Sequence, residues 1–161
     1  MIQNKEGQRV PAVTFRTRED GQWKDVTTEQ LFAGKTVVVF ALPGAFTPTC
    51  SAKHLPGFVQ HAGSIKGKGV DTIACLSVND AFVMGAWGKD QNVGDKVLML
   101  ADGSGDFTEA LGLTLDLTPN GMGKRSKRYA MVVDNGTVTA LNVEEPGKFE
   151  VSSAEAVLKQ L

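Results

Sequence analysis

The sequence predicts an α/β fold in which helices flank a central mixed β-sheet, forming a single domain over residues 1–161. The chain length, with 42% hydrophobic and 22% charged residues, suits one globular domain with a full core. Two continuous apolar runs, 36–42 and 72–78, are typical of strands buried on both faces. Asn135-Gly136, between two further apolar runs, is a strong hairpin signal. Parallel strands with a late antiparallel hairpin make the predicted sheet mixed.

The N-terminal third of the chain predicts a hairpin and a short helix before the first buried strand. Alternation around Val13-Thr14-Phe15 indicates a strand, and Asp20-Gly21 indicates a tight turn. Thr27, with Gln30 three residues later, resembles a capping box that opens a helix. Gly34 then ends that helix in the left-handed conformation usual after a C-cap.

The rest of the chain alternates helices and strands. Apolar residues recur at helical spacing from 55 to 65, and Asn79 or Asp80 is expected to cap a helix containing Phe82, Val83 and Trp87. A short strand at 97–100 and a short helix at 107–111 follow, and residues 113–125, rich in Gly, Pro and Asn, are expected to be irregular. After the hairpin strands, Ser152 or Ser153 caps a last helix that runs to Leu161. The thioredoxin-like architecture has this order of elements.

Composition and charge exclude several classes of function. A formal net charge of -1 offers no general attraction for nucleic acid or an anionic membrane, and the basic run at 124–128 is interpreted as a solvated loop. The polar start resembles no signal peptide, and the longest apolar run stops at Pro43, far short of a membrane span. A cytoplasmic location is the default expectation, although a chain whose organelle import peptide had been removed would look the same. Two Cys and two His without a close cluster predict neither zinc nor another cofactor.

The segment from Pro43 to Cys50 carries the chemistry. It follows a central strand, where open α/β sheets place their ligand sites. Thr47 suits the N-cap of the next helix, and Pro48 suits its first position. Cys50 then lies in the first turn, where free backbone N–H groups and the helix dipole favour a thiolate over a thiol. Cys50 is therefore the candidate nucleophile.

Ionisation alone is too small an effect to make this cysteine an efficient catalyst. An ordinary thiol with a pKa of about 8.5 is ionised to about 3% at neutral pH, so full ionisation raises its rate by about 30-fold. Further donors must bind the leaving oxygen as charge develops on it. The Thr47 hydroxyl is one candidate. Arg128, which immediately precedes a strand and is therefore held firmly, is the candidate cation.

The cysteines and histidines also have structural interpretations. Free cysteines are often buried core residues, and this is the preferred interpretation of Cys75, which lies within an apolar strand. For Cys50 the strand, Pro-Gly loop and helix start favour the nucleophile. His54 could act as a base, but a packed or solvent-facing histidine is the preferred interpretation, and His61 is given no role.

Pro43, Thr47 and Cys50 match the Pro-x-x-x-Thr-x-x-Cys signature of the peroxiredoxins. The string 43–51 and segments at 54–58, 74–83, 128–133 and 140–144 resemble the branch called peroxiredoxin-five or type II, over nearly the whole chain. The resemblance implies reduction of hydrogen peroxide and alkyl hydroperoxides through a Cys50 sulfenic acid. It further implies that Thr47 hydrogen-bonds the sulfur and the peroxide, that Arg128 holds the thiolate, and that Pro43 shields the pocket.

The resemblance also sets expectations about partners. No second cysteine occurs at 147–152, where some members of this branch carry a resolving residue, and Cys75 is a poor substitute. Glutathione with a glutaredoxin, or thioredoxin, is then the expected reductant. A homodimer through the active-site end would involve Phe46 and Phe82. The alternatives are a redox sensor that oxidises a partner protein and a thioredoxin-like thiol–disulfide oxidoreductase, although Thr47 stands where the latter would carry its first cysteine.

Overall fold

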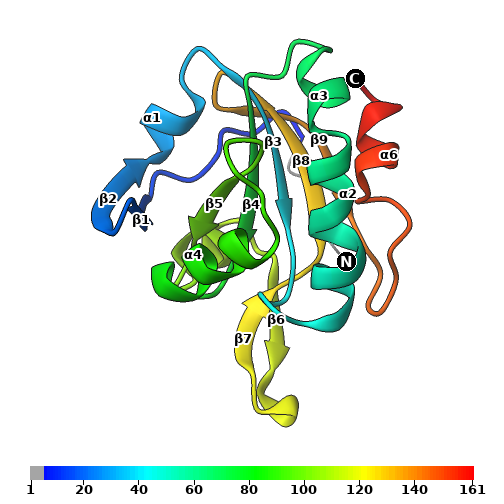
Figure 1. Cartoon of the computed structure of the whole chain (residues 1–161). Helices are drawn as coiled ribbons and strands as arrows, with labels where there is room; N and C mark the ends of the chain where they lie inside the picture. The colour runs from blue at the N-terminus through cyan, green and yellow to red at the C-terminus, as the bar shows by residue number, and fades with distance from the viewer. Residues whose placement is uncertain (1–5) are drawn as a thin grey trace.

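The computed structural model describes residues 6–161, which form a central sheet with helices on both faces (Figure 1). The sheet has the strand order β5-β4-β3-β8-β9. Its strands are β3 (Thr36–Ala41), β4 (Thr72–Ser77), β5 (Leu98–Ala101), β8 (Tyr129–Asp134) and β9 (Thr137–Val143). Strands β3, β4 and β5 are parallel, whereas β8 and β9 are antiparallel to their neighbours. The prediction of a mixed sheet is confirmed.

Strand β3 is buried on both faces, as its apolar run predicts. Val38 and Phe40 pack on the face covered by the helices that follow Cys50, by α4 (Ala81–Asp90) and by α6 (Ala154–Leu158). Val37 and Val39 pack on the other face, against β1 (Thr14–Glu19), α1 (Thr28–Phe32) and α5 (Asp106–Ala110). The two clusters hold β3 at the centre of the molecule, so the loop that follows it starts from a rigid element.

The local signals of the sequence fix most turns and caps. Asp20 and Gly21 take positive φ between β1 and β2 (Gln22–Thr27), and Asn135 and Gly136 do so between β8 and β9. Thr27 forms the capping box of α1. Asp80 caps α4 and Ser153 caps α6. The last helix ends at Leu158, three residues before the predicted end.

The expectation that residues 113–125 are irregular is wrong. Strand β6 (Thr114–Leu117) pairs antiparallel with β7 (Gly123–Ser126) around the 3₁₀ turn η2 (Thr118–Asn120), and this hairpin projects from the body of the molecule (Figure 1). Its strands are only four residues long and mostly polar, so no apolar alternation marks them in the sequence. Asp116 accepts from the Thr118 backbone N–H and Gly121 has a positive φ, and together these shape the turn.

The helix that carries Cys50 begins with an irregular turn. Pro48 and Thr49 are α-helical, and the π-helical turn η1 (Cys50–His54) follows, in which the Leu55 N–H donates to the Cys50 carbonyl. Regular helix resumes in α2 (Leu55–Gln60) and α3 (Ala62–Lys66). Pro56 has no N–H to donate to the Ala52 carbonyl, so it disturbs the regular helix at this point. The disturbance takes the form of the wide turn just before it.

None of the helices described in residues 6–161 is long and apolar enough to span a membrane.

Candidate active site

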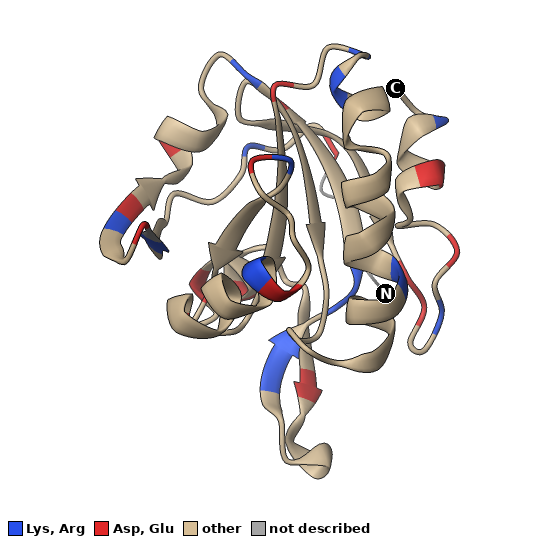
Figure 2. Ribbon diagram, in the orientation of Figure 1, with Lys and Arg blue, Asp and Glu red and all other residues tan. Residues whose placement is uncertain are grey.

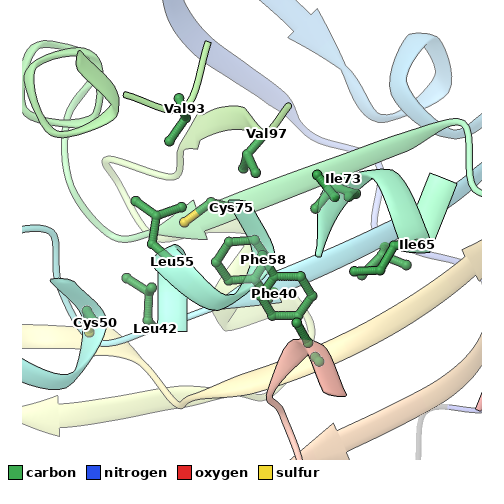
Figure 3. Packing of buried hydrophobic residues seen from close by; sticks show 14 of the residues in the cluster. Phe40, Leu42, Cys50, Leu55, Phe58, Ile65, Ile73, Cys75, Val93 and Val97 are labelled. Atoms are coloured by element: carbon green, nitrogen blue, oxygen red, sulfur yellow. The ribbon is translucent and has the colours of Figure 1, made fainter. Parts of the chain in front are cut away.

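Cys50 lies in the first helical turn after β3, as predicted, and its side chain is fully buried. The Ser51 N–H donates to the Thr47 carbonyl over 2.9 Å, so the helix starts at Thr47. Leu42 and Leu55 pack in the same cluster as Cys50 (Figure 3). Because no surface of Cys50 reaches solvent in this conformation, a ligand reaches the sulfur only past the residues around it.

Arg128 is the cation that contacts Cys50. Its Nη2 donates to the Cys50 Sγ over 3.2 Å, and its Nη1 donates to the Nδ1 of His54 over 3.0 Å. The Cζ atom lies 5.9 Å from the centroid of the Phe149 ring. Arg128 directly precedes β8, and its carbonyl accepts from the Glu144 N–H, so the backbone is fixed by the sheet. The two NH2 groups of one guanidinium thus join the cysteine to the histidine.

His54 is a buried residue that holds Arg128, a role the sequence analysis missed. A guanidinium only donates, so the Nδ1 atom accepts and the proton lies on Nε2, which donates to the Ser152 carbonyl over 2.9 Å. Burial, followed by the Arg128 charge, lowers the pKa of His54 from 6.5 to about 3. The imidazole is therefore neutral near pH 7, which makes it an acceptor for Arg128 without adding a second positive charge.

Glu144 ties down the loop that carries Ser152. Its Oε2 accepts from the backbone N–H groups of Glu150, Val151 and Ser152 and from the Ser152 hydroxyl, over 2.7–2.9 Å. Burial raises the pKa of the Glu144 carboxyl, but the four hydrogen bonds together hold it below its usual value. The carboxylate therefore fixes the carbonyl that orients His54, and through it Arg128. No motif in the sequence marks this role.

The loop between β3 and Cys50 is held from several sides. The Thr47 hydroxyl donates to the Gly44 carbonyl over 2.6 Å instead of capping a helical N–H, so its oxygen is left to accept. Arg125, on β7, donates from Nη1 to the Pro43 carbonyl over 3.3 Å. The Ala45 N–H donates to the Asn79 Oδ1 over 3.0 Å. The β6–β7 hairpin, which the sequence analysis treated as irregular, is therefore a support of this loop.

Cys75 lies in the core, as expected. It is fully buried on β4, and in Figure 3 the side chains of Leu42 and Leu55 lie between it and Cys50. Burial, followed by the proximity of Cys50, raises the pKa of the Cys75 thiol. Both cysteines are free. A protonated thiol behind two leucines is poorly placed to attack an oxidised Cys50.

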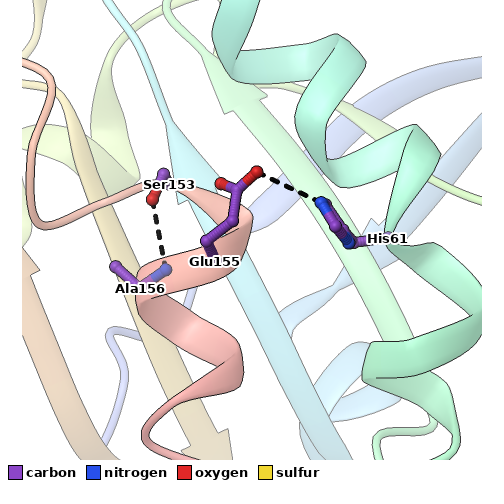
Figure 4. A network of polar contacts seen from close by, with 4 residues as sticks. All are labelled: His61, Ser153, Glu155 and Ala156. Atoms are coloured by element: carbon purple, nitrogen blue, oxygen red, sulfur yellow. Dashed lines mark hydrogen bonds and ion pairs between the residues drawn. The ribbon is translucent and has the colours of Figure 1, made fainter.

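A pocket of about 540 Å³ adjoins the site. The residues that line it are Pro43, Thr49, Lys53, Leu115, Lys127, Arg128 and the loop 144–150. The pocket thus touches residues on either side of Cys50, although Cys50 itself does not line it. His61 lies elsewhere, at the surface, where its Nε2 pairs with Glu155 over 3.1 Å (Figure 4).

Two exposed aromatic residues lie on or near α4: Phe82 is in the helix, and the Phe46 ring lies 6.4 Å from that of Trp87. Phe46, in the loop before Cys50, is 53% exposed and has a φ of 63°, and Phe82, on α4, is 58% exposed. The ring of Phe82 meets the edge of Trp23 at 5.3 Å, and the Arg18 guanidinium lies 4.8 Å from its centroid. Large exposed aromatic residues in one region are typical of an interaction surface.

Comparison with known proteins agrees with this geometry. The sequence model of the Redoxin family matches residues 5–158, which places the chain in the class of thioredoxin-like redoxin proteins. It is 53% identical over 159 residues to the chloroplastic peroxiredoxin-2E of Arabidopsis thaliana, covering 96% of this chain and 68% of the relative. It is 50% identical over 163 residues to the hybrid peroxiredoxin hyPrx5 of Haemophilus influenzae, covering 99% and 67%.

Solved structures agree as well. Reduced Prx3 of Vibrio vulnificus in complex with H2O2 superimposes with a TM-score of 0.94 at 53% identity, covering 98% of this chain and 99% of that one. The chain therefore belongs to the peroxiredoxin family, in its type II branch. This membership supports a thiol-dependent peroxidase activity.

Proposed function

We propose that the chain reduces hydrogen peroxide and alkyl hydroperoxides through a sulfenic acid on Cys50. The observation that carries the proposal is the 3.2 Å contact between the Arg128 Nη2 and the Cys50 Sγ. A fixed cation against a buried sulfur favours the charged, nucleophilic thiolate and remains beside it when a peroxide arrives. A cysteine that only packed the core would be expected to contact apolar side chains and not a guanidinium.

The steps follow from the donors and acceptors around the sulfur. The thiolate attacks the terminal oxygen of the hydroperoxide, the O–O bond breaks, and the leaving oxygen takes a proton to give water or an alcohol. The Arg128 guanidinium stabilises the charge that develops on the leaving oxygen. The Thr47 oxygen, whose own proton is donated to Gly44, accepts the hydrogen bond of the attacked O–H and orients it. Pro43, which lines the pocket, keeps water away from the thiolate.

His54, Glu144 and Arg125 act as positioning residues. His54 fixes the second NH2 group of Arg128, and Glu144 fixes the Ser152 carbonyl that orients His54. Arg125 fixes the Pro43 carbonyl. Each acts through another residue and not on the peroxide itself.

Mass spectrometry with a sulfenic-acid probe tests the proposal. One equivalent of hydrogen peroxide is expected to label Cys50 in the wild-type chain, and Cys50→Ser is expected to abolish both labelling and peroxide consumption. Cys75→Ala is the matched control, and it should keep both. Labelling of Cys75 alone, or peroxide consumption by Cys50→Ser, would refute the assignment.

We propose an external thiol as the reductant: glutathione, with or without a glutaredoxin, or thioredoxin. Two observations support an external source. Cys75 is buried behind Leu42 and Leu55, and the loop 147–152 contains no cysteine. Steady-state turnover with each reductant separately, monitored as peroxide loss, distinguishes them. An intramolecular Cys50–Cys75 disulfide as the main product of one equivalent of peroxide, seen by intact mass, would contradict this because Cys75 would then be the resolving thiol.

We further propose a homodimer through the surface that carries Phe46 and Phe82. Burial of two half-exposed aromatic rings supports association, and the neighbouring Trp23 and Arg18 extend that surface. Phe82→Glu is expected to shift the wild-type dimer to a monomer in sedimentation velocity, whereas Leu98→Glu, at another exposed apolar residue, serves as the control. An unchanged dimer in Phe82→Glu would refute this surface. The cytoplasmic location stays a prediction.

A further inference from the structure

We propose that a second pocket, between the β1–β2 hairpin and α4, binds a medium-chain carboxylate such as octanoate. Its lining comes from residues within three segments, 17–26, 85–89 and 93–99, and it is called the β1–α4 pocket below. The volume is about 370 Å³, at the small end of the range for small-molecule sites, about 300–1,000 Å³. Among the described residues it shares no lining residue with the pocket beside Cys50, so the inference does not depend on the peroxidase function.

The charged residues that line the β1–α4 pocket within the described chain are all cations. They are Arg18 on β1, Lys24 on β2 and Lys89 on α4. Figure 2 shows blue segments on the β1–β2 hairpin and on α4. A red segment on β2 is Asp25, which pairs with Arg16 over 2.8 Å. An anion in the pocket therefore meets positive side chains from both the hairpin and the helix.

Arg18 is held in place before a ligand binds. Its Nη2 donates to the Gly21 carbonyl over 2.6 Å, and its Cζ lies 5.1 Å from the Trp23 ring centroid and 4.8 Å from that of Phe82. These three partners are neutral, and the Gly21 carbonyl takes only one of the five N–H donors of a guanidinium. An arginine already fixed on aromatic rings loses less conformational entropy when it binds a carboxylate than a mobile one would.

Apolar side chains form most of the remaining lining. Val93 and Val97 are buried, Met99 is half-buried, and the side chain of Leu98 is 37% exposed. A small hydrated anion gains nothing from these residues. An alkyl chain does, because each methylene that it buries lowers the Kd about 4-fold. Cations beside an apolar lining indicate a ligand with one negative head group and a short hydrocarbon chain.

A glycine on α4 leaves this space open. A Cβ at Gly88 would lie 3.0 Å from the Met99 Cγ, so close packing explains that glycine. A Cβ at Gly85, which also lines the pocket, would meet no heavy atom within 4 Å. Glycine inside a helix is destabilising, and neither packing nor backbone conformation requires it at position 85. The missing side chain at Gly85 instead provides room for a ligand.

Isothermal titration calorimetry of the full chain tests the chemistry of the ligand. Octanoate is expected to bind saturably, and hexanoate, which is two methylenes shorter, about 15-fold more weakly. Octylammonium has the same chain with the opposite charge, and inorganic phosphate has the charge without the chain. Both are expected to bind at least about 10-fold more weakly than octanoate. Equal affinity for octylammonium would overturn the role of the cations, and equal affinity for phosphate would overturn the role of the apolar lining.

Two variants test the location of the ligand. Gly85→Leu is expected to weaken octanoate binding at least about 10-fold, because the new side chain occupies the pocket. Gly63→Leu, at another helical glycine whose Cβ would stand in open space, is the matched control and should keep the affinity. Lys89→Glu is expected to weaken octanoate about 3- to 10-fold, whereas Lys68→Glu, at an exposed lysine outside the pocket, should not.

The remaining outcomes would overturn the proposal. They are an absence of saturable octanoate binding up to about 10 mM, and unchanged affinity in both Gly85→Leu and Lys89→Glu. Loss of affinity in Lys53→Glu but not in Gly85→Leu would place the ligand beside Cys50 instead. Peroxide consumption, measured in parallel, should be the same in Gly85→Leu and the wild-type chain. Because the readout is binding, failure of the peroxidase function would leave the result on this pocket intact.

Discussion

Replacing Arg128 with alanine is expected to lower the rate constant with hydrogen peroxide by more than a loss of the Cys50 thiolate could explain. The substitution removes the Nη2 donor 3.2 Å from the fully buried Cys50 sulfur. An ordinary thiol is ionised to only about 3% at pH 7, so loss of the thiolate can lower the rate by at most about 30-fold. Loss of one preorganised donor to a developing oxyanion costs a further 10²- to 10³-fold or so. The rate constant with hydrogen peroxide at pH 7 should therefore fall by at least about 10²-fold, and by no more than about 3 × 10⁴-fold if both effects act in full.

Measurements at high pH separate the loss of thiol ionisation from the loss of the donor to the leaving oxygen. The indole of Trp87 is buried and donates to the Ser51 hydroxyl over 3.1 Å, so its fluorescence in a Trp23→Phe background reports oxidation of the neighbouring Cys50. At pH 9.5 an ordinary thiol is mostly ionised, and a deficit of about 10²- to 10³-fold should persist. Alkylation with iodoacetamide measures the thiolate alone and is the control. A peroxide deficit that matches the alkylation deficit at every pH would refute the role of Arg128 beyond ionisation.

Three further outcomes are expected. Cys75→Ser should keep most glutathione-dependent turnover, measured as peroxide consumption, and a large loss would make Cys75 the resolving residue. His54→Leu, which leaves the Arg128 Nη1 without its acceptor, should lower the rate constant with peroxide while His54→Gln restores part of it in stopped-flow measurements. Glu144→Gln should lower the free energy of unfolding by about 1–3 kcal/mol in urea titrations, because it weakens four hydrogen bonds to a buried carboxylate.

The sequence predicts the sheet and the nucleophile because both depend on local patterns. Apolar runs, the capping box and Asn135-Gly136 each act within a few residues, and so does the placement of Cys50 in a first helical turn. Arg128 could be proposed from its position before a strand. The role of His54 could not, since its partners are contributed by residues 74 and 98 positions away. The β6–β7 hairpin was missed because its strands are short and polar, and its support of the active-site loop comes through side chains that no local pattern marks, such as Arg125 donating to the Pro43 carbonyl.

The neutral state of His54 links the geometry of the site to acid stability. Its pKa is about 3 in the folded protein and 6.5 as a free side chain, so between these values the unfolded chain binds a proton that the folded chain does not. Stability should then fall with falling pH by about 1.4 kcal/mol per unit across this window, or roughly 2 kcal/mol at pH 5. Glu144, with a lowered pKa, adds stability that is lost only as its carboxylate takes up a proton, below the ordinary value of 4.5. The acid sensitivity from pH 6.5 to 4.5 therefore belongs to His54. Urea titrations of His54→Gln should show a flatter dependence on pH in that interval, and an unchanged slope would mean that Arg128 is not held by a neutral imidazole.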